Sequence, residues 1–346
     1  MAYHSFLTIL LPAIFSLIAT VAAIKLVMPY FYNAGIVAED RNKEKIKKIP
    51  GSGGVTVAFG VTVGILAYTF GASFLFPAII NVSTILAVAL SIILIAGVGF
   101  IDDINVKTKR VQVTGMKGIN QGLKQWQKPL LTIIGALPLM AINAGVSTVH
   151  IPFLGLVHFG IFFPIIIIPL SVMFVTNSYN LLGGFNGLEA STGLIAGVGL
   201  MLYSFFFGNA IGLFLSSVLV GSLLAFLCFN WYPAKLLPGD SLTYCIGGAI
   251  IAIMIIGHAE AFGLIIFIPW IIEFILHLRG KFKVTDLGIR QKDGTLKAPY
   301  GKKIFSLTHI AMNLKKTKET DVTIMLAAFE VLFVVIALGL AVGGLL

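Results

Sequence analysis

Charged side chains are scarce in this sequence: they make up 11% of its 346 residues, whereas hydrophobic residues make up 58%. A soluble globular protein cannot bury so much apolar surface, so the composition excludes that class and indicates a polytopic membrane protein. No polar stretch is long enough to form a soluble domain of useful size. We therefore expect one integral membrane domain over residues 1–346.

Cysteine is also rare. Cys228 and Cys245 lie in or beside apolar runs and lack the spacing of metal ligands, so neither a disulfide framework nor a zinc site is expected. The first apolar run has no basic segment before it and is too long for a cleaved signal, so it is expected to be a membrane span. We find no internal repeat of the kind that many transporters have.

Ten apolar runs have about the length needed to cross a hydrocarbon layer roughly 30 Å thick. They cover residues 6–31, 53–72, 83–101, 129–145, 161–176, 188–206, 211–229, 241–257, 262–278 and 321–343. We therefore predict an all-α polytopic fold with about ten transmembrane helices. Between the fourth and fifth runs, "STVHIPFLGLVHFG" alternates apolar and polar residues around a Leu-Gly turn, which predicts a short extracytoplasmic β-hairpin.

Lysine and arginine are absent from every second connection between these runs. The other connections carry 23 of the 24 basic residues, and Lys25, near the inner end of the first run, can extend to the interface. The positive-inside rule places the basic set in the cytoplasm and both termini outside. Topology thus explains much of the net charge of +10, although anionic lipid or a phosphorylated substrate would also favour a basic face.

Polar clusters of the sequence fall on the same cytoplasmic face. The third run ends in "GFIDDINVKTKR", where Asp102 and Asp103 stand at a helix C-terminus. The negative end of the helix dipole opposes two acids there, so they need a cation, a proton or a catalytic role. The alternative is a polar helix end that returns to water.

A second cluster, "NSYNLLGGFNGLEA", covers residues 177–190. Asn177 and Asn180 share one helix face at a spacing of three residues, and Gly183 with Gly184 lets backbone approach a ligand. Amide oxygens can ligate a hard cation such as Mg²⁺, and an amide edge can bind a nucleobase. The alternative is a helix-capping turn.

Further segments bring charge to this face. In "FNWYPAKLLPGDSLTY", Asp240 precedes a span and is either a helix N-cap or part of a Mg²⁺-phosphate site. The loop "KKIPGSGGV" (47–55) and the segment 278–299, with Lys281 and Lys283, can hold phosphates, although solvated basic loops are common.

In this order, "KIPGSGG", "GFIDD", "NSYNLLGGFNGLE" and "NWYPAKLLPGD" resemble the motifs of the polyprenyl-phosphate N-acetylhexosamine-1-phosphate transferases, and the resemblance extends over residues 40–300. The pattern is closer to the eukaryotic and archaeal branch, which uses UDP-GlcNAc and dolichyl phosphate. Bacterial members have aspartate at the positions of Gly183 and Asn186. Eukaryotic relatives have an Arg-His-Arg element where this chain has Lys281-Phe282-Lys283.

The resemblance implies a role for each matching residue. The implied metal ligands, for Mg²⁺ or alternatively Mn²⁺, are Asn180 and Asp240. The implied nucleotide-sugar contacts are Lys48, Ile49, Pro50, Asn186 (at the uridine), Gly187, Lys281 and Lys283. The implied lipid-phosphate contacts are Lys128, Asn177 and Asn180, the catalytic residues are Asp102, Asp103 and Lys128, and Asn230 and Glu189 form a second tier.

The resemblance further implies Mg²⁺-dependent transfer of GlcNAc-1-phosphate from UDP-GlcNAc to dolichyl or another polyprenyl phosphate, as the first step of N-glycan lipid synthesis, with inhibition by tunicamycin. Asp102 and Asp103 would organise Lys128 and the lipid phosphate, or Asp102 would abstract a proton. The expected location is an archaeal cell membrane, or the endoplasmic reticulum of a eukaryote, with a cytoplasmic active site.

Other hypotheses remain open from the sequence. A transporter or flippase for an anionic lipid or nucleotide sugar, or a non-catalytic scaffold, would also present a basic cytoplasmic face. Nucleic acid is not an expected partner, and a homodimer is left open. Glu273 and Glu330, both inside apolar runs, have no assigned role.

Overall fold

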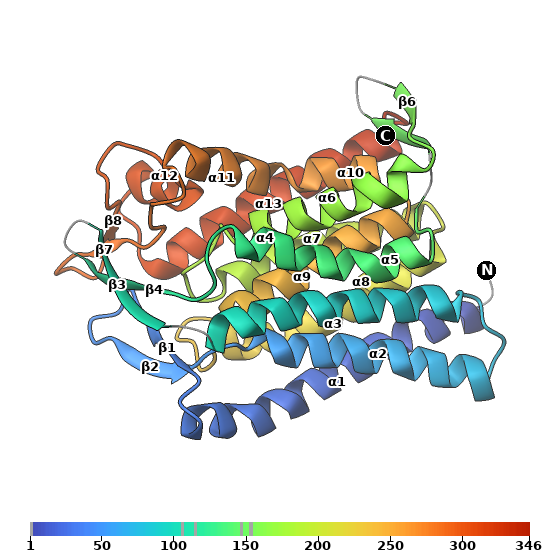
Figure 1. Cartoon of the computed structure of the whole chain (residues 1–346), viewed down its shortest axis with the longest axis horizontal. Coiled ribbons are helices and arrows are strands. Elements are labelled where there is room, and N and C mark those ends of the chain that lie inside the picture. The colour runs from blue at the N-terminus through green and yellow to red at the C-terminus, as the bar shows by residue number, and fades with distance from the viewer. Residues whose placement is uncertain (1–2, 105–106, 114–115, 146–147, 152–154) are drawn as a thin grey trace.

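The computed structural model describes residues 3–104, 107–113, 116–145, 148–151 and 155–346, and its helices run side by side in one elongated bundle (Figure 1). Within these described ranges, seven helices are long and apolar enough to cross a membrane. They are α1 (Tyr3–Asn33), α2 (Gly54–Phe74), α3 (Val82–Ile104), α7 (Leu188–Phe206), α8 (Ala210–Asn230), α9 (Gly239–Ile256) and α13 (Glu319–Val342).

The remaining three apolar runs form shorter or interrupted helices. α10 (Glu260–Ile266) and α11 (Ile268–Arg279) are bent by 55° at a break followed by Pro269, whose ring lacks an amide donor. The other two are α4 (Gln127–Thr132) with η1 (Ile133–Ala136) and α5 (Leu137–Ala141), and η2 (Phe163–Ile167) with α6 (Ile168–Tyr179). All ten runs are therefore helical, whereas the number of ten spans remains a prediction.

The expectation of an all-α fold is wrong in one respect, because the described loops also form four two-stranded antiparallel sheets. These sheets are β1 (Val37–Asp40) with β2 (Lys47–Pro50), β3 (Lys107–Val113) with β4 (Met116–Gln121), β5 (Thr148–Ile151) with β6 (Gly155–His158), and β7 (Ile289–Arg290) with β8 (Leu296–Lys297). Only the β5–β6 hairpin was predicted. Its strands are confirmed, and its turn at 152–154 lies outside the described residues.

The two ends of the bundle differ. β1–β4, β7, β8 and α12 (Leu307–Leu314) lie at one end, whereas both chain termini and the β5–β6 hairpin lie at the opposite end (Figure 1). This arrangement agrees with termini on one side of a membrane. Which side faces the cytoplasm remains a prediction from the charge distribution.

α9 is the centre of the bundle. Of its residues 89% are buried, compared with 28% of the apolar window of α13, and α2, α3, α6, α7 and α8 pack around it. Gly99 of α3 allows a close approach, because a Cβ there would lie 2.5 Å from the backbone oxygen of Asp240. α3 therefore fixes the position of the first turn of α9.

The two intramembrane acids without an assigned role are both buried. Glu273 of α11 accepts a hydrogen bond from the Leu307 backbone amide over 2.7 Å. Glu330 of α13 is 1% exposed, and its carboxylate oxygens have no hydrogen-bond partner among the described residues.

We expect Gly99→Ala to lower the thermal stability of the purified protein, because an overpacked contact costs about 1–3 kcal/mol. Gly97→Ala is the matched control, since a Cβ at Gly97 of the same helix would meet nothing within 4 Å. Thermal unfolding of both variants in detergent measures the difference. Equal melting temperatures would contradict the close α3–α9 contact.

Candidate active site

Lys128 joins two carboxylates at the place where α3 ends and α4 and α9 begin. Its Nζ atom lies 2.6 Å from Asp102 Oδ2 and 2.7 Å from Asp240 Oδ2. The side chains of Lys128 and Asp240 are 23% and 27% exposed, whereas that of Asp102 is 8% exposed. One positive and two negative charges leave this group, the Lys128 cluster, with an excess of negative charge that can attract a cation.

Asp103 points to a different partner. Its two carboxylate oxygens accept hydrogen bonds from the backbone amides of Asp240, at 2.7 Å, and Ser241, at 3.2 Å. Gly239 permits this approach, because its φ is +67° and a Cβ would lie 2.4 Å from Asp103 Oδ2. A helix N-terminus stabilises a negative charge, whereas a helix C-terminus destabilises one. The N-terminus of α9 therefore stabilises the Asp103 carboxylate, which lies at the unfavourable C-terminal end of α3.

The second asparagine of the NSYN stretch, Asn180, contacts the same cluster. Asn180 Nδ2 donates to Asp240 Oδ2 over 3.2 Å, and its Oδ1 accepts a hydrogen bond from the Thr243 hydroxyl. The two predicted metal ligands, Asn180 and Asp240, therefore lie side by side although they are 60 residues apart.

Asn177 lies one turn earlier on α6 and binds protein groups. Its Nδ2 donates to Thr132 Oγ1 over 3.0 Å, and its Oδ1 accepts from the Tyr244 hydroxyl over 3.1 Å. These bonds connect α4, α6 and α9 behind Lys128. Asn177 thus supports the helices that carry the cluster.

Glu189 occupies the space beside the glycine pair. Its Oε1 accepts the Gly184 amide over 2.9 Å, and a Cβ on Gly183 would lie 2.5 Å from that oxygen. Glu189 Oε2 is buried without a hydrogen-bond partner among the described residues. The carboxylate of Glu189 therefore takes the room that a side chain at position 183 would need.

Asn186, expected at the uridine, is 4% exposed and connects three segments. Its Nδ2 donates to Asp40 Oδ1 and its Oδ1 accepts from the Ala234 amide, both over 3.1 Å. Its backbone amide donates to Glu319 Oε1 over 3.0 Å, at the start of α13. The side chain of Asn186 is thus a buried cross-link.

Gly187 and Asn230 also belong to the packing around this cross-link. Gly187 has φ +79°, and its amide donates to Asn230 Oδ1 over 3.1 Å. Asn230 is fully buried, and its Nδ2 donates to the Leu236 carbonyl over 2.9 Å. These bonds fix the loop between α8 and α9 against the start of α7.

The predicted nucleotide-sugar loops reach this end of the bundle by backbone contacts. The Pro50 carbonyl at the end of β2 accepts the Leu237 amide over 2.9 Å, so Lys48 and Ile49 of the same strand border the loop before α9. Between Lys281 and Lys283, the Phe282 carbonyl accepts Gln125 Nε2 over 3.0 Å. The turn after α11 therefore contacts the segment before Lys128.

Several residues near Asn186 were missed from the sequence. Lys43 pairs with Asp40 over 3.1 Å and with Glu319, and it lies 4.6 Å from the centre of the Tyr232 ring. The spacing of three residues between Asp40 and Lys43 could have indicated their ion pair from the sequence. The ion pair of Lys43 with Glu319 joins distant parts of the chain and could not have been predicted in this way.

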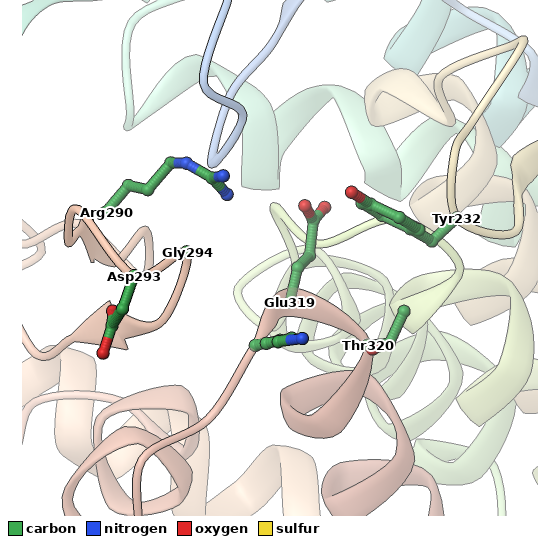
Figure 2. A pocket seen from close by; sticks show the side chains of 7 residues that line it. Tyr232, Arg290, Asp293, Gly294, Glu319 and Thr320 are labelled. Atoms are coloured by element: carbon green, nitrogen blue, oxygen red, sulfur yellow. The ribbon is translucent and has the colours of Figure 1, made fainter.

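Glu319 and Tyr232 also line a pocket of ≈ 320 Å³. Figure 2 shows Arg290 and Tyr232 extending toward Glu319 from opposite sides. The pocket shares no lining residue with the Lys128 cluster, and the remaining lining residues are Asp293, Gly294, Lys318 and Thr320.

The sequence matches known proteins over nearly its whole length. A protein of Saccharolobus solfataricus is 36% identical and one of Sulfolobus acidocaldarius is 32% identical, each match covering 96% of both chains. Both carry the provisional name UDP-N-acetylglucosamine–dolichyl-phosphate N-acetylglucosaminephosphotransferase. A Dictyostelium discoideum enzyme of that name is 28% identical over 66% of this chain and 60% of its own.

A family profile agrees with these matches and with the motifs identified from the sequence. The description glycosyl transferase family 4 matches residues 85–258, which include Asp102, Lys128, Asn180 and Asp240. The chain therefore belongs to glycosyl transferase family 4.

Proposed function

We propose that this chain transfers N-acetylglucosamine 1-phosphate from UDP-N-acetylglucosamine to dolichyl or another polyprenyl phosphate and releases UMP. The observation that carries the proposal is the Lys128 cluster, in which a lysine joins Asp102 and Asp240 at helix ends and Asp240 also accepts a hydrogen bond from Asn180. The names of the near full-length relatives indicate the same reaction.

A lipid substrate needs access from the membrane. The side chains of Ile101 and Ile104 at the end of α3, and of Leu130 and Ile134 beyond Lys128, are 41–56% exposed. In a bilayer these apolar side chains face lipid rather than water. A polyprenyl chain can therefore lie along α3 and α4 while its phosphate reaches Lys128.

The two reactants are both anions, so the site must first reduce their repulsion. Lys128 supplies a fixed positive charge, and the N-terminus of α9 adds the positive end of its dipole at the same place. Asp103 holds that helix end through two backbone amides. Positioning and charge neutralisation of this kind provide most of the rate in phosphoryl transfer.

The oxygen donors of the cluster fit Mg²⁺, and Asp240 and Asn180 would hold it. Lys128 keeps Asp102 as a partner when Asp240 ligates a cation. If the Asn180 amide turns its oxygen outward, Asn180 Nδ2 can donate a hydrogen bond to the Thr243 hydroxyl oxygen. The Thr243 hydroxyl can then donate its own proton to the Asp240 backbone carbonyl, which lies 3.1 Å away. When bound, Mg²⁺ supplies charge that stabilises the pyrophosphate oxygens and the departing UMP.

The proposed reaction forms one bond and breaks one. A phosphate oxygen of the lipid attacks the β-phosphorus of UDP-N-acetylglucosamine, and the bond to the UMP oxygen breaks with its electron pair. A phosphate monoester has its second pKa at about 6, so no strong base is needed at neutral pH. Because Asp102 binds Lys128 and the Leu123 amide, we propose that it organises Lys128 rather than abstracting a proton.

We place the site on the cytoplasmic face of the membrane, because the basic loops lie at the end of the bundle where the cluster lies (Figure 1). The near full-length relatives from Saccharolobus and Sulfolobus support an archaeal cell membrane. The product would start the synthesis of a lipid-linked oligosaccharide for N-glycosylation. A transporter would place its polar site near the midplane, so this geometry favours the enzyme.

The direct test combines purified protein with radiolabelled UDP-N-acetylglucosamine, dolichyl phosphate and Mg²⁺. We expect labelled lipid and UMP in equal amounts, loss of both with EDTA, and inhibition by tunicamycin. Thin-layer chromatography of the lipid phase detects the product. Absence of both products, under conditions in which a known relative is active, would rule out the proposed activity.

Replacement of the central lysine tests the cluster itself. We expect Lys128→Gln to reduce kcat by roughly 10²–10³-fold, because it removes the fixed charge that faces the phosphates. Lys124→Gln, an exposed lysine of the same segment, is the control and should retain activity. Equal kcat values for the two variants would remove Lys128 from the reaction.

The Asn186→Ala variant distinguishes two roles of Asn186, a direct contact with uridine and a structural cross-link between loops. The variant leaves the Ala234 amide without its partner and leaves Asp40 with Lys43 alone, so we expect a stability loss of about 1–3 kcal/mol together with a higher KM for UDP-N-acetylglucosamine. Asn313→Ala, at an exposed position, is the control. A higher KM at unchanged melting temperature would instead indicate that Asn186 contacts the nucleotide directly.

A further inference from the structure

A second cluster of metal-ligating side chains lies at the end of α11. Glu273 and His277 share one face of this helix at a spacing of four residues, and Asp286 approaches from the following loop. One ligand atom from each lies within 4.8 Å of the other two. The cluster shares no residue with the Lys128 cluster.

The three side chains do not satisfy one another. His277 Nε2 lies 2.9 Å from Asp286 Oδ1 and 3.0 Å from Glu273 Oε1. A ring nitrogen has one proton or one lone pair, so it can pair with only one of these oxygens. The hydrogen bond goes to Asp286, and Glu273 Oε1 is buried without a hydrogen-bond partner among the described residues.

The charge of the cluster is also unbalanced. Glu273 is 0% exposed, and its ion-pair partner is the same histidine that pairs with Asp286. Glu189 of α7 lies close enough to Asp286 for their carboxylates to interact electrostatically. One imidazole therefore faces several carboxylates in a buried place, where unpaired charge is unfavourable.

Hydrogen bonds from outside the cluster hold two of its residues in place. Glu273 Oε2 accepts the Leu307 amide over 2.7 Å at the start of α12. The Asp286 carbonyl accepts the Thr308 hydroxyl over 2.9 Å. Such outer contacts orient the ligands of metal sites in proteins.

We propose that Glu273, His277 and Asp286 bind a divalent transition metal ion of the Zn²⁺ class. Zn²⁺ holds nitrogen and oxygen ligands at about 2.0–2.2 Å in a tetrahedron, which separates neighbouring ligand atoms by roughly 3.3–3.6 Å. The two distances to Nε2 need to increase by only a few tenths of an ångström. The imidazole favours such an ion over Mg²⁺, and water can fill the fourth position.

The ion would fasten the last loop at this end of the bundle. The turn after α11 has φ +54° at both Lys281 and Phe282, an unfavourable conformation for residues other than glycine. It precedes Asp286 and contacts the segment before α4 through Gln125. A metal that joins α11 to Asp286 would hold this turn, and the lysines within it, in place.

The test measures metal binding without any assay of transfer. Full-length protein in detergent, freed of affinity tag and stripped with EDTA, is titrated with Zn²⁺ against a chromogenic chelator in excess Mg²⁺. We expect about one Zn²⁺ per chain, and a loss of affinity of more than about 100-fold in Asp286→Asn, because even outer-shell changes cost 10–100-fold. Asp286→Asn keeps the size of the side chain and an acceptor for His277.

Three comparisons make the result specific. Asp293→Asn, at an exposed acid of the same loop, should bind Zn²⁺ as wild type does. Asp240→Asn should also keep this ion, which separates it from a metal at the Lys128 cluster. Co²⁺ in place of Zn²⁺ should give a tetrahedral visible spectrum that His277→Gln abolishes.

Two results would overturn the proposal. The first is wild-type protein that binds no Zn²⁺ in the micromolar range, which would leave His277 as an ion-pair bridge between two acids. The second is an ion that Asp286→Asn retains or that Asp240→Asn removes. Gel filtration and thermal unfolding of each variant show whether a loss of binding reflects loss of fold.

Discussion

The contact between Asp103 and the first amides of α9 is the interaction on which this end of the molecule depends. It joins the C-terminal end of one helix to the N-terminal end of another, where both the carboxylate and the amides would otherwise lack partners. The close approach at Gly99 brings α3 and α9 together one turn away. With α9 held in this way, Asp240 meets Lys128 and Asn180, and helices rather than loops position the residues of the proposed site.

Much of this arrangement could be predicted from the sequence. The apolar runs predicted the helices, because a bilayer requires a minimum length of apolar chain. The order of the motifs indicated the family. Asp102, Lys128, Asn180 and Asp240 do meet in the structure. The partners of Asp103 could not be predicted, because they are backbone amides, which carry no residue signature.

The same limit applies to Asn186. Its side chain binds an aspartate 146 residues away and a backbone amide 48 residues away, and no spacing rule indicates such pairs. The β1–β2 and β7–β8 hairpins were missed for another reason: their strands have two to four residues, each strand carries charge, and they look like solvated loops. The residues named from the motifs therefore divide into a group that meets at Lys128 and a group that holds the loops together.

The burial of α9 has a consequence for the order in which the protein matures during synthesis. α3, with Asp102 and Asp103, leaves the ribosome well before Asp240, so both acids must first be solvated at the membrane surface, where water reaches them. α9 follows α2, α3, α6, α7 and α8 in the chain and packs against all five, so few of its residues can meet lipid. The Lys128 cluster is complete only after α9 has joined them, so a chain interrupted before α9 carries most of the motif residues and no assembled site.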